Sequence, residues 1–207
     1  MDFITSSHIA GSYFEFGTHR ARTFTMVMGL DDFYASNMGV TAGGLTPKNG
    51  GGFMTKYFVF DSFEGFPEDV NVRHHAQYVP GGAKTAPNEF LNLLASYGQY
   101  SQRVELTKGF FDKSLTKSLA TRFLDENVKA LPITVACNLY DSCKSVFAWV
   151  DQFMQHGTVL YPDDFNSERA QPTQGPKLAF KEYKVQTKWR FEPFLPVGWA
   201  GYSFIVC

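Results

Sequence analysis

YFEFG at residues 13–17 begins an alternation of apolar strands and helical patterns that continues to the end of the chain. It is followed by RARTFTMVMGL at residues 20–30, whose apolar side chains have helical spacing, and by KYFVFD at residues 56–61, which predicts a second strand. Strands that alternate with helices are typical of a mostly parallel sheet with right-handed crossovers. The sequence therefore predicts an α/β fold with helices on both faces of one sheet.

The later part of the chain continues this pattern, with turn and cap residues between the segments. We expect the remaining elements in this order: a helix at 87–97 that Gly98 ends, a strand at 103–107, a helix over about 115–128 capped by Asp112 or Ser114, a strand at 132–139, a helix opened by Ser142, a strand at 157–161, a helix at 177–189, and a closing hairpin of 190–195 with 202–206.

Length and charge exclude several classes of protein. The 207 residues suit one domain, and 19 basic against 20 acidic side chains argue against a nucleic-acid binder with a broad basic face. The chain contains no run of 18 apolar residues and begins without the pattern of a secretion signal, so we expect neither a membrane helix nor export. Three cysteines fit a reducing cytoplasm. The sequence predicts one cytoplasmic domain over residues 1–207, with a flexible glycine-rich loop at about 39–52.

Acidic side chains follow the predicted strands at the sheet edge where ligands bind in such folds. Glu15 precedes Gly17 in a tight turn, and the lack of further glycines there disfavours a dinucleotide or nucleotide-sugar enzyme. Asp61 ends the second strand and could bind a ribose diol or cap the next segment. Asp163 and Asp164 follow the fifth strand and could hold a hard cation such as magnesium, or could be one solvated residue and one helix cap. Together these residues predict a nucleoside-like ligand.

Five strings, GSYFEFG, VFDSFEGFPE, LTKGFF, NLYDS and GTVLYPDDF, resemble the macrocin O-methyltransferase family of S-adenosylmethionine-dependent enzymes in order and spacing. The likeness runs from about Gly11 to Val206, and D-S-F-E-G-x-P is its most specific element. It implies a Rossmann-like class I methyltransferase fold, with a seven-stranded, mostly parallel sheet whose last strand is antiparallel. The implied activity is O-methylation of a small-molecule hydroxyl, for example on the sugar of a glycosylated metabolite.

The resemblance also implies which residues bind S-adenosylmethionine. Asp163 and Asp164 match the paired carboxylates that bind magnesium in the sugar methyltransferases of the family. The implied cofactor contacts lie at the first three strand ends: Glu15, Gly17 and Thr18 for the methionine part, Asp61 for the ribose, Ser62 and Phe63 beside the adenosine, and Gly109 and Phe110 near the adenine. His19, in the first turn, is a further implied cofactor contact.

The chain departs from the family at the fourth strand end, where D-x-D-L-Y-x-S is replaced by ACNLYDS at residues 136–142. A metal-binding aspartate of the family falls on Ala136, and its proposed general base falls on Asn138, whose neutral amide cannot take a proton. Asp163 and Asn138 are therefore the candidate catalytic residues. Asp163 and Asp164 would form a weak magnesium site, or one of them would be the base without metal.

Several alternatives stay open at this point. Loss of the two carboxylates favours a catalytically silent protein that still binds S-adenosylmethionine or S-adenosylhomocysteine. Tyr140 and Asp141, or His74 and His75, could replace the missing base, although strand-to-helix turns and surface loops also carry such residues. The expected partner is a small-molecule acceptor, with no nucleic acid and no membrane. The chain starts close to the first strand, which leaves little room for the family's lid segment, so a second subunit in a homo-oligomer could close the site.

Overall fold

The computed structural model describes residues 1–38, 53–68, 78–98 and 102–207. The predicted glycine-rich loop at 39–52 and the histidines His74 and His75 lie outside the described residues. Within these four ranges, no helix combines the length and the apolar character that crossing a membrane requires.

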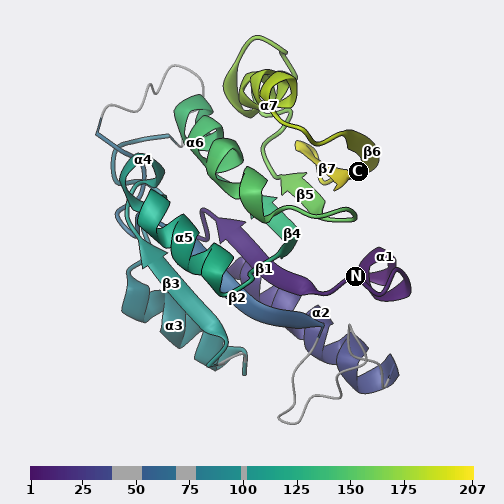
Figure 1. The fold of residues 1–207 in the computed structure, drawn as a ribbon. Coiled ribbons are helices and arrows are strands. Elements are labelled where there is room, and N and C mark those ends of the chain that lie inside the picture. Colours follow the sequence, from purple (N-terminus) through teal and green to yellow (C-terminus); the bar gives the residue numbers. More distant parts are fainter. Residues whose placement is uncertain (39–52, 69–77, 99–101) are drawn as a thin grey trace.

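The described residues form one seven-stranded sheet in the order β3-β2-β1-β4-β5-β7-β6 (Figure 1). Neighbouring strands from β3 to β5 are parallel, and β7 is antiparallel to both β5 and β6. The predicted mostly parallel sheet with an antiparallel last strand is confirmed. The strands are β1 (Gly11–Phe16), β2 (Met54–Asp61), β3 (Val104–Lys108), β4 (Ala130–Val135), β5 (Val159–Pro162), β6 (Phe191–Val197) and β7 (Gly201–Val206).

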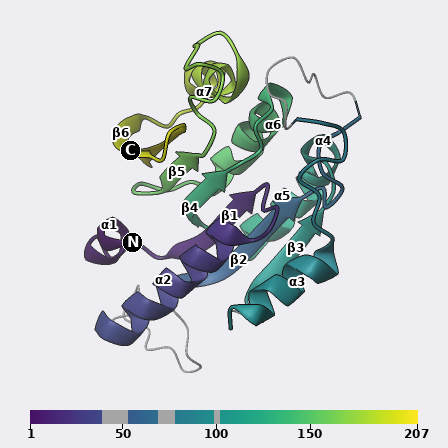
Figure 2. The ribbon, with the colours of Figure 1, turned by 180° about the vertical axis from the view of Figure 1, so that it is seen from behind.

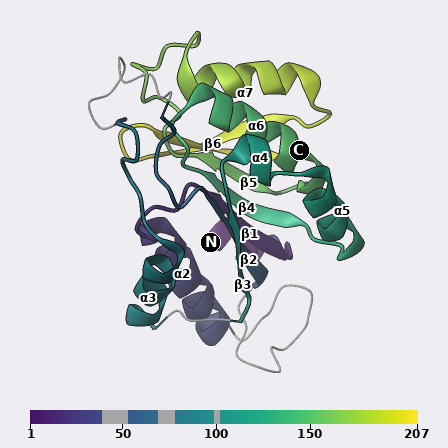
Figure 3. The ribbon, with the colours of Figure 1, turned by 90° about the vertical axis from the view of Figure 1, so that its left-hand side faces the viewer.

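Helices cover both faces of this sheet, as the alternating pattern predicts (Figures 2 and 3). Two of them, α2 (Arg22–Met38) and α3 (Pro87–Ser96), lie on one face. The opposite face is covered by α4 (Phe111–Ser114), α5 (Lys117–Asp125), α6 (Tyr140–Val150) and α7 (Gly175–Gln186). The short α1 (Asp2–Ser6) precedes β1, and a 3-10 helix, η2 (Asp151–Phe153), follows α6.

The central strands β1 and β2 are buried on both faces by aromatic side chains. Phe14 and Phe16 of β1 and Phe58 and Phe60 of β2 face α5 and α6, and the rings of Phe16 and Phe60 stack with their centroids 4.5 Å apart. Tyr13 lies on the other face, in the core formed with α2 and α3. All five side chains are fully buried. The carboxyl ends of β1 and β2 are therefore held in place by packing on both sides.

Two helix starts differ from the predictions. Thr116 caps α5, because its hydroxyl accepts a hydrogen bond from the backbone N–H of Leu119 at 3.2 Å. Asp112 and Ser114, the predicted caps, lie in the preceding short helix α4. The next helix, α6, begins at Tyr140, two residues before the predicted Ser142.

The fourth strand ends earlier than its apolar run suggests. β4 stops at Val135 rather than at the predicted Leu139. The backbone N–H of Ala136 still donates to the carbonyl of Phe16 at 2.8 Å, but Asn138 then takes a left-handed conformation with φ +55°. The chain therefore turns toward α6 at Asn138, and this turn brings residues 136–138 to the rim of the sheet.

Candidate functional site

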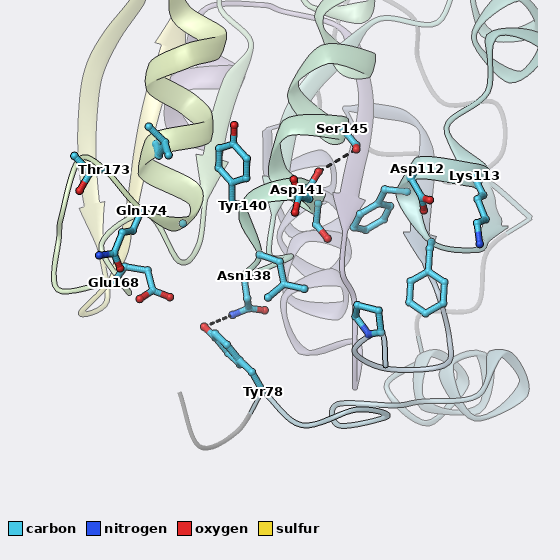
Figure 4. A pocket seen from close by; sticks show the side chains of 17 residues that line it. Tyr78, Asp112, Lys113, Asn138, Tyr140, Asp141, Ser145, Glu168, Thr173 and Gln174 are labelled. Atoms are coloured by element: carbon cyan, nitrogen blue, oxygen red, sulfur yellow. Dashed lines mark hydrogen bonds between the residues drawn. The ribbon is translucent and has the colours of Figure 1, made fainter. Parts of the chain in front are cut away.

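Two adjoining cavities lie at the carboxyl edge of the parallel strands. The strand-end cleft has a volume of about 610 Å³ and is lined by residues that include Glu15, Gly17, Asp61, Ala136 and Asp163. The helix-side cavity, about 700 Å³, lies next to the first turns of α4, α6 and α7 (Figure 4). Tyr78, Phe110 and Asn138 are among the residues that line both cavities. The strand ends that the sequence singles out therefore meet in one place, as expected for this class of sheet.

Gly17 makes the first turn possible. Its φ is +82°, and a Cβ atom there would lie 2.2 Å from the carbonyl oxygen of Ala136. Its backbone N–H donates to the carbonyl of Phe60 at 2.9 Å. No other residue type fits both the conformation and this approach to the end of β4. The turn therefore presents the backbone of Thr18 and His19 to the cleft.

Asp61 joins the turns after β1 and β2. One carboxylate oxygen accepts from the backbone N–H of Thr18 at 2.7 Å, and the other accepts from the N–H of Phe63 at 2.7 Å. The backbone N–H of His19 donates to the same Asp61 oxygen as that of Thr18, at 3.4 Å. The His19 ring nitrogen Nδ1 lies 2.7 Å from the carbonyl oxygen of Ala83. These bonds fix the position of the Asp61 carboxylate at the cleft. The oxygen bonded to Thr18 and His19, Oδ2, also accepts from the Thr18 hydroxyl at 3.4 Å, whereas Oδ1 accepts from the N–H of Phe63 and retains a second lone pair.

Glu15 is a buried acid at the end of β1. Its side chain is 2% exposed and accepts a hydrogen bond from the hydroxyl of Tyr13. Burial raises the pKa of the Glu15 carboxyl to about 8, the Tyr13 hydrogen bond opposes this increase, and the carboxylates of Asp163 and Asp61 add to it. A positively charged ligand would favour the ionised form of the Glu15 carboxyl and would lower its pKa. The cleft is therefore suited to a cation.

Of the two residues after Asp61, Ser62 lines the cleft and the Phe63 side chain lies outside it. The Phe63 side chain is 2% exposed and packs against Phe90, with ring centroids 6.1 Å apart, so it belongs to the core. The prediction that Phe63 lies beside a ligand therefore does not fit its side-chain position. Ser62 lines the cleft, and its hydroxyl donates to the carbonyl of Gly65 at 2.9 Å.

Gly109 and Phe110 follow β3. The N–H of Gly109 donates to the backbone carbonyl of Asp61 at 2.9 Å, which ties this turn to the end of β2. Phe110 lines the wall between the two cavities. Gly109 is thus placed to shape the turn, and Phe110 is placed to contact a ligand.

The ends of β4 and β5 form the other wall of the cleft. The side-chain amide of Asn138 donates to a carboxylate oxygen of Asp164 and to the hydroxyl oxygen of Tyr78, the latter at 3.2 Å (Figure 4). Asp163 accepts a hydrogen bond from the hydroxyl of Tyr161. Both carboxylates of the pair therefore already have neutral hydrogen-bond donors.

These residues do not fit a magnesium site. Magnesium prefers several oxygen ligands in octahedral geometry. Ala136 has no side-chain atom that could bind a metal, and the Asn138 amide directs an N–H toward Asp164. Among residues 1–38, 53–68, 78–98 and 102–207, no group of three or more His, Cys, Asp or Glu side chains could hold a metal ion. The magnesium expected at Asp163 and Asp164 is therefore not supported.

Tyr140, an alternative base in the sequence analysis, and the nearby thiol of Cys137 both have structural contacts. The Tyr140 hydroxyl donates to Glu182 of α7 at 2.6 Å, so this side chain links two helices. Cys137 is 8% exposed, lies 3.4 Å from the sulfur of Cys143, and has a thiol pKa that burial raises. A buried, protonated thiol is a poor nucleophile, which agrees with a core position.

Sequence reasoning missed three tyrosines of this site. Tyr13 and Tyr161 stand two residues before Glu15 and Asp163, and i, i+2 spacing on a strand puts both members of a pair on the same face. That spacing is a usable signal for a tyrosine–carboxylate pair. Tyr78 comes from a separate segment with no such spacing, so only the fold brings it to Asn138.

Comparisons with known proteins support the fold. The chain matches no protein-family model, and no curated protein matches its sequence. The O-methyltransferase NovP is similar with a TM-score of 0.70 and 15% identity, over 99% of this chain and 75% of NovP. CalS11, a calicheamicin methyltransferase, gives a TM-score of 0.67 and 19% identity, over 99% of this chain and 78% of its own. TomG of Streptomyces achromogenes, solved with S-adenosylmethionine, gives 0.53 and 13%, over 98% and 76%.

The chain thus has the Rossmann-like fold of class I methyltransferases, and the similar structures are O-methyltransferases. At sequence identities of 13–19%, the similarity to these structures shows the fold alone. They do not support the narrower resemblance to the macrocin O-methyltransferase family.

Proposed function

We propose that the strand-end cleft binds S-adenosylmethionine and that the chain transfers the methyl group to a hydroxyl of a small molecule without a metal. One observation carries this proposal: Glu15 and Asp61 line the same cleft beside the Gly17 turn, in a fold shared with O-methyltransferases. S-adenosylmethionine would supply an electrophilic methyl group on a positively charged sulfur. Similar folds have been solved with this molecule, and with S-adenosylhomocysteine in the enzyme from Bacillus cereus.

The chain's own residues suit the parts of this ligand. Glu15 would bind its amino group, because a buried carboxyl beside two other acids gains most from a cation. Asp61 would accept a hydrogen bond from a ribose hydroxyl through the second lone pair of its Oδ1. Phe110 offers an apolar wall for the adenine.

A hydroxyl acceptor must lose its proton during attack, which requires a base at the cleft. Asn138 cannot accept a proton, so Asp163 or Asp164 would take it. A sugar hydroxyl is the acceptor that we propose, since CalS11 is a TDP-rhamnose 3'-O-methyltransferase. The three cysteines are free thiols, which agrees with the cytoplasmic location that we propose.

Binding of S-adenosylhomocysteine, measured by titration calorimetry, tests the cofactor part of this proposal. We expect the wild type to bind it and Asp61→Asn to lose about tenfold in affinity, or about 1.4 kcal/mol. Asp125→Asn on the exposed end of α5 is the matched control and should bind as the wild type does. Wild-type protein that binds neither S-adenosylhomocysteine nor S-adenosylmethionine would contradict the proposal.

A second candidate function is a silent protein that binds the cofactor without transferring its methyl group. Ala136 and Asn138 favour it, because neither can act as the base or the metal ligand expected at those positions. A panel of glycosides, incubated with labelled S-adenosylmethionine and a chelator, separates the two functions. Labelled product supports the enzyme, and tight binding without product across the panel supports the silent binder.

A further inference from the structure

Asn138 lies at the boundary between the strand-end cleft and the helix-side cavity. It lines both, and so does Tyr78, whose hydroxyl oxygen accepts from the Asn138 amide at 3.2 Å (Figure 4). Tyr78 is 6% exposed and its ring packs against Phe66, with centroids 5.1 Å apart. The Tyr78 hydroxyl is therefore held at the junction through which an acceptor in one cavity would meet a methyl donor in the other.

The backbone of Asn138 sets the direction of its side chain. Its φ of +55° is left-handed, a conformation that asparagine adopts more readily than most residues. The amide then donates one hydrogen to Asp164 at the end of β5 and the other to Tyr78. Both hydrogens of the amide nitrogen are used, so Asp164 and Tyr78 are joined through one group that carries no charge.

We propose that Asn138 is a positioning residue that joins Asp164, Asn138 and Tyr78 into one hydrogen-bonded unit, which organises the acceptor side of the site in place of a metal ion. The role of this unit in methyl transfer rests on the proposed function. A cation at Asp164 would face an N–H of Asn138, and the neighbouring Asp163 already accepts a hydrogen bond from Tyr161. The unit therefore provides fixed donors where a metal would provide positive charge.

Replacement of Asn138 by aspartate tests this exclusion of metal. The change puts a third carboxylate beside Asp163 and Asp164, and three such groups suit a hard divalent cation. Binding of Mn²⁺, read as loss of the free-ion signal in electron paramagnetic resonance, should appear in Asn138→Asp at one ion per chain. The wild type and Asn127→Asp should leave the signal unchanged. Asn127 is the matched control because it has φ +53° and is exposed in the turn before β4.

Two results would overturn the proposal. One is Mn²⁺ binding by the wild type that Asp163→Asn abolishes, and the other is a folded Asn138→Asp protein that binds no Mn²⁺. Neither readout uses S-adenosylmethionine, so a failure here is separate from a failure of the calorimetric test.

The hydrogen bond to Tyr78 has its own spectroscopic readout, which also serves if Asn138→Asp does not fold. In protein labelled with 3-fluorotyrosine, Tyr78→Phe assigns the fluorine resonance of Tyr78. Asn138→Ala should shift that resonance, because the phenol oxygen loses a hydrogen-bond donor, and Asn127→Ala should not. An unchanged Tyr78 resonance in folded Asn138→Ala would show that the unit does not exist.

Discussion

The carboxyl of Glu15 is buried among aromatic and acidic neighbours, and it keeps its proton to a higher pH than an ordinary glutamate does. Burial raises its pKa from 4.5 to about 8. Between these values the folded state holds a proton that the unfolded state has released, so the folded state binds more protons. The free energy of unfolding must then fall as the pH rises through this range, because ionisation of the solvated carboxyl stabilises the unfolded state while the buried carboxyl stays protonated.

We predict that Glu15→Gln removes this loss of stability. Relative to the variant, the wild type should lose free energy of unfolding between pH 5 and pH 8, by at most about 1.4 kcal/mol per pH unit. Urea denaturation at several pH values measures the difference. Glu89→Gln, on the exposed side of α3, is the control and should follow the wild-type profile. Parallel profiles for wild type and Glu15→Gln would contradict the prediction.

At the residue scale, the sequence predicted which acids line the cleft better than it predicted the contacts of their neighbours. Glu15, Asp61 and Asp163 were recognisable because acids at strand ends stand out in an apolar chain. Phe63 was assigned to the ligand although its side chain is in the core, since a turn of φ +55° sends it inward and no sequence pattern reports that angle.

At the scale of elements, apolar periodicity located the centres of strands and helices but did not determine where they begin and end. The run from 132 to 139 continues past Val135 in apolar character, yet the strand stops there, because the turn at Asn138 depends on contacts with β1 and β5. The five residues at 112–116, just before α5, include three of the types that cap helices: Asp112, Ser114 and Thr116. Only the path of the chain selects Thr116.

Thr116→Ala should therefore destabilise the protein by about 1 kcal/mol, through loss of the cap on the N–H of Leu119. Asp112→Ala, at an exposed position in α4, should change the stability by less than about 0.5 kcal/mol. Chemical denaturation of the two variants measures both values. A larger loss for Asp112→Ala than for Thr116→Ala would show that the helix is capped as the sequence suggested.

At the scale of the whole molecule, aromatic packing around β1 and β2 holds the sheet together. Phe14 contacts the rings of Phe58, Phe60, Phe123 and Phe153, with centroid distances of 5.0–6.1 Å. Fully buried aromatic clusters of this kind contribute through both burial and ring contacts. The same cluster fixes the strand ends that form the cleft.

Phe14→Ala should cost about 3–5 kcal/mol of the free energy of unfolding, because it opens a cavity in this cluster. Phe33→Ala, at a side chain that is 59% exposed on α2, should stay within about 0.5 kcal/mol of the wild type. Thermal and urea unfolding of both variants provide the comparison. Equal losses would mean that the central aromatic cluster is not the main source of stability.

The overall architecture was predictable because it follows from the order of the segments. Alternating strands and helices leave few topologies once crossovers are right-handed, and the closing hairpin of β6 and β7 was visible as two late apolar runs. The acceptor side of the site was not predictable in the same way. Its contacts join Tyr78, Asn138 and Asp164 from three separate segments, and no local pattern encodes such a meeting.

The outermost strand β6 contains Pro193 and Pro196, and its pairing register with β7 shifts between them. Proline has no N–H to donate, so the open side of this strand cannot offer an unbroken row of hydrogen bonds to an incoming peptide. Such a broken edge resists the strand addition that leads to amyloid-like aggregation. Leu195 and Val197 can therefore face solvent on this strand without making it a template for fibre growth.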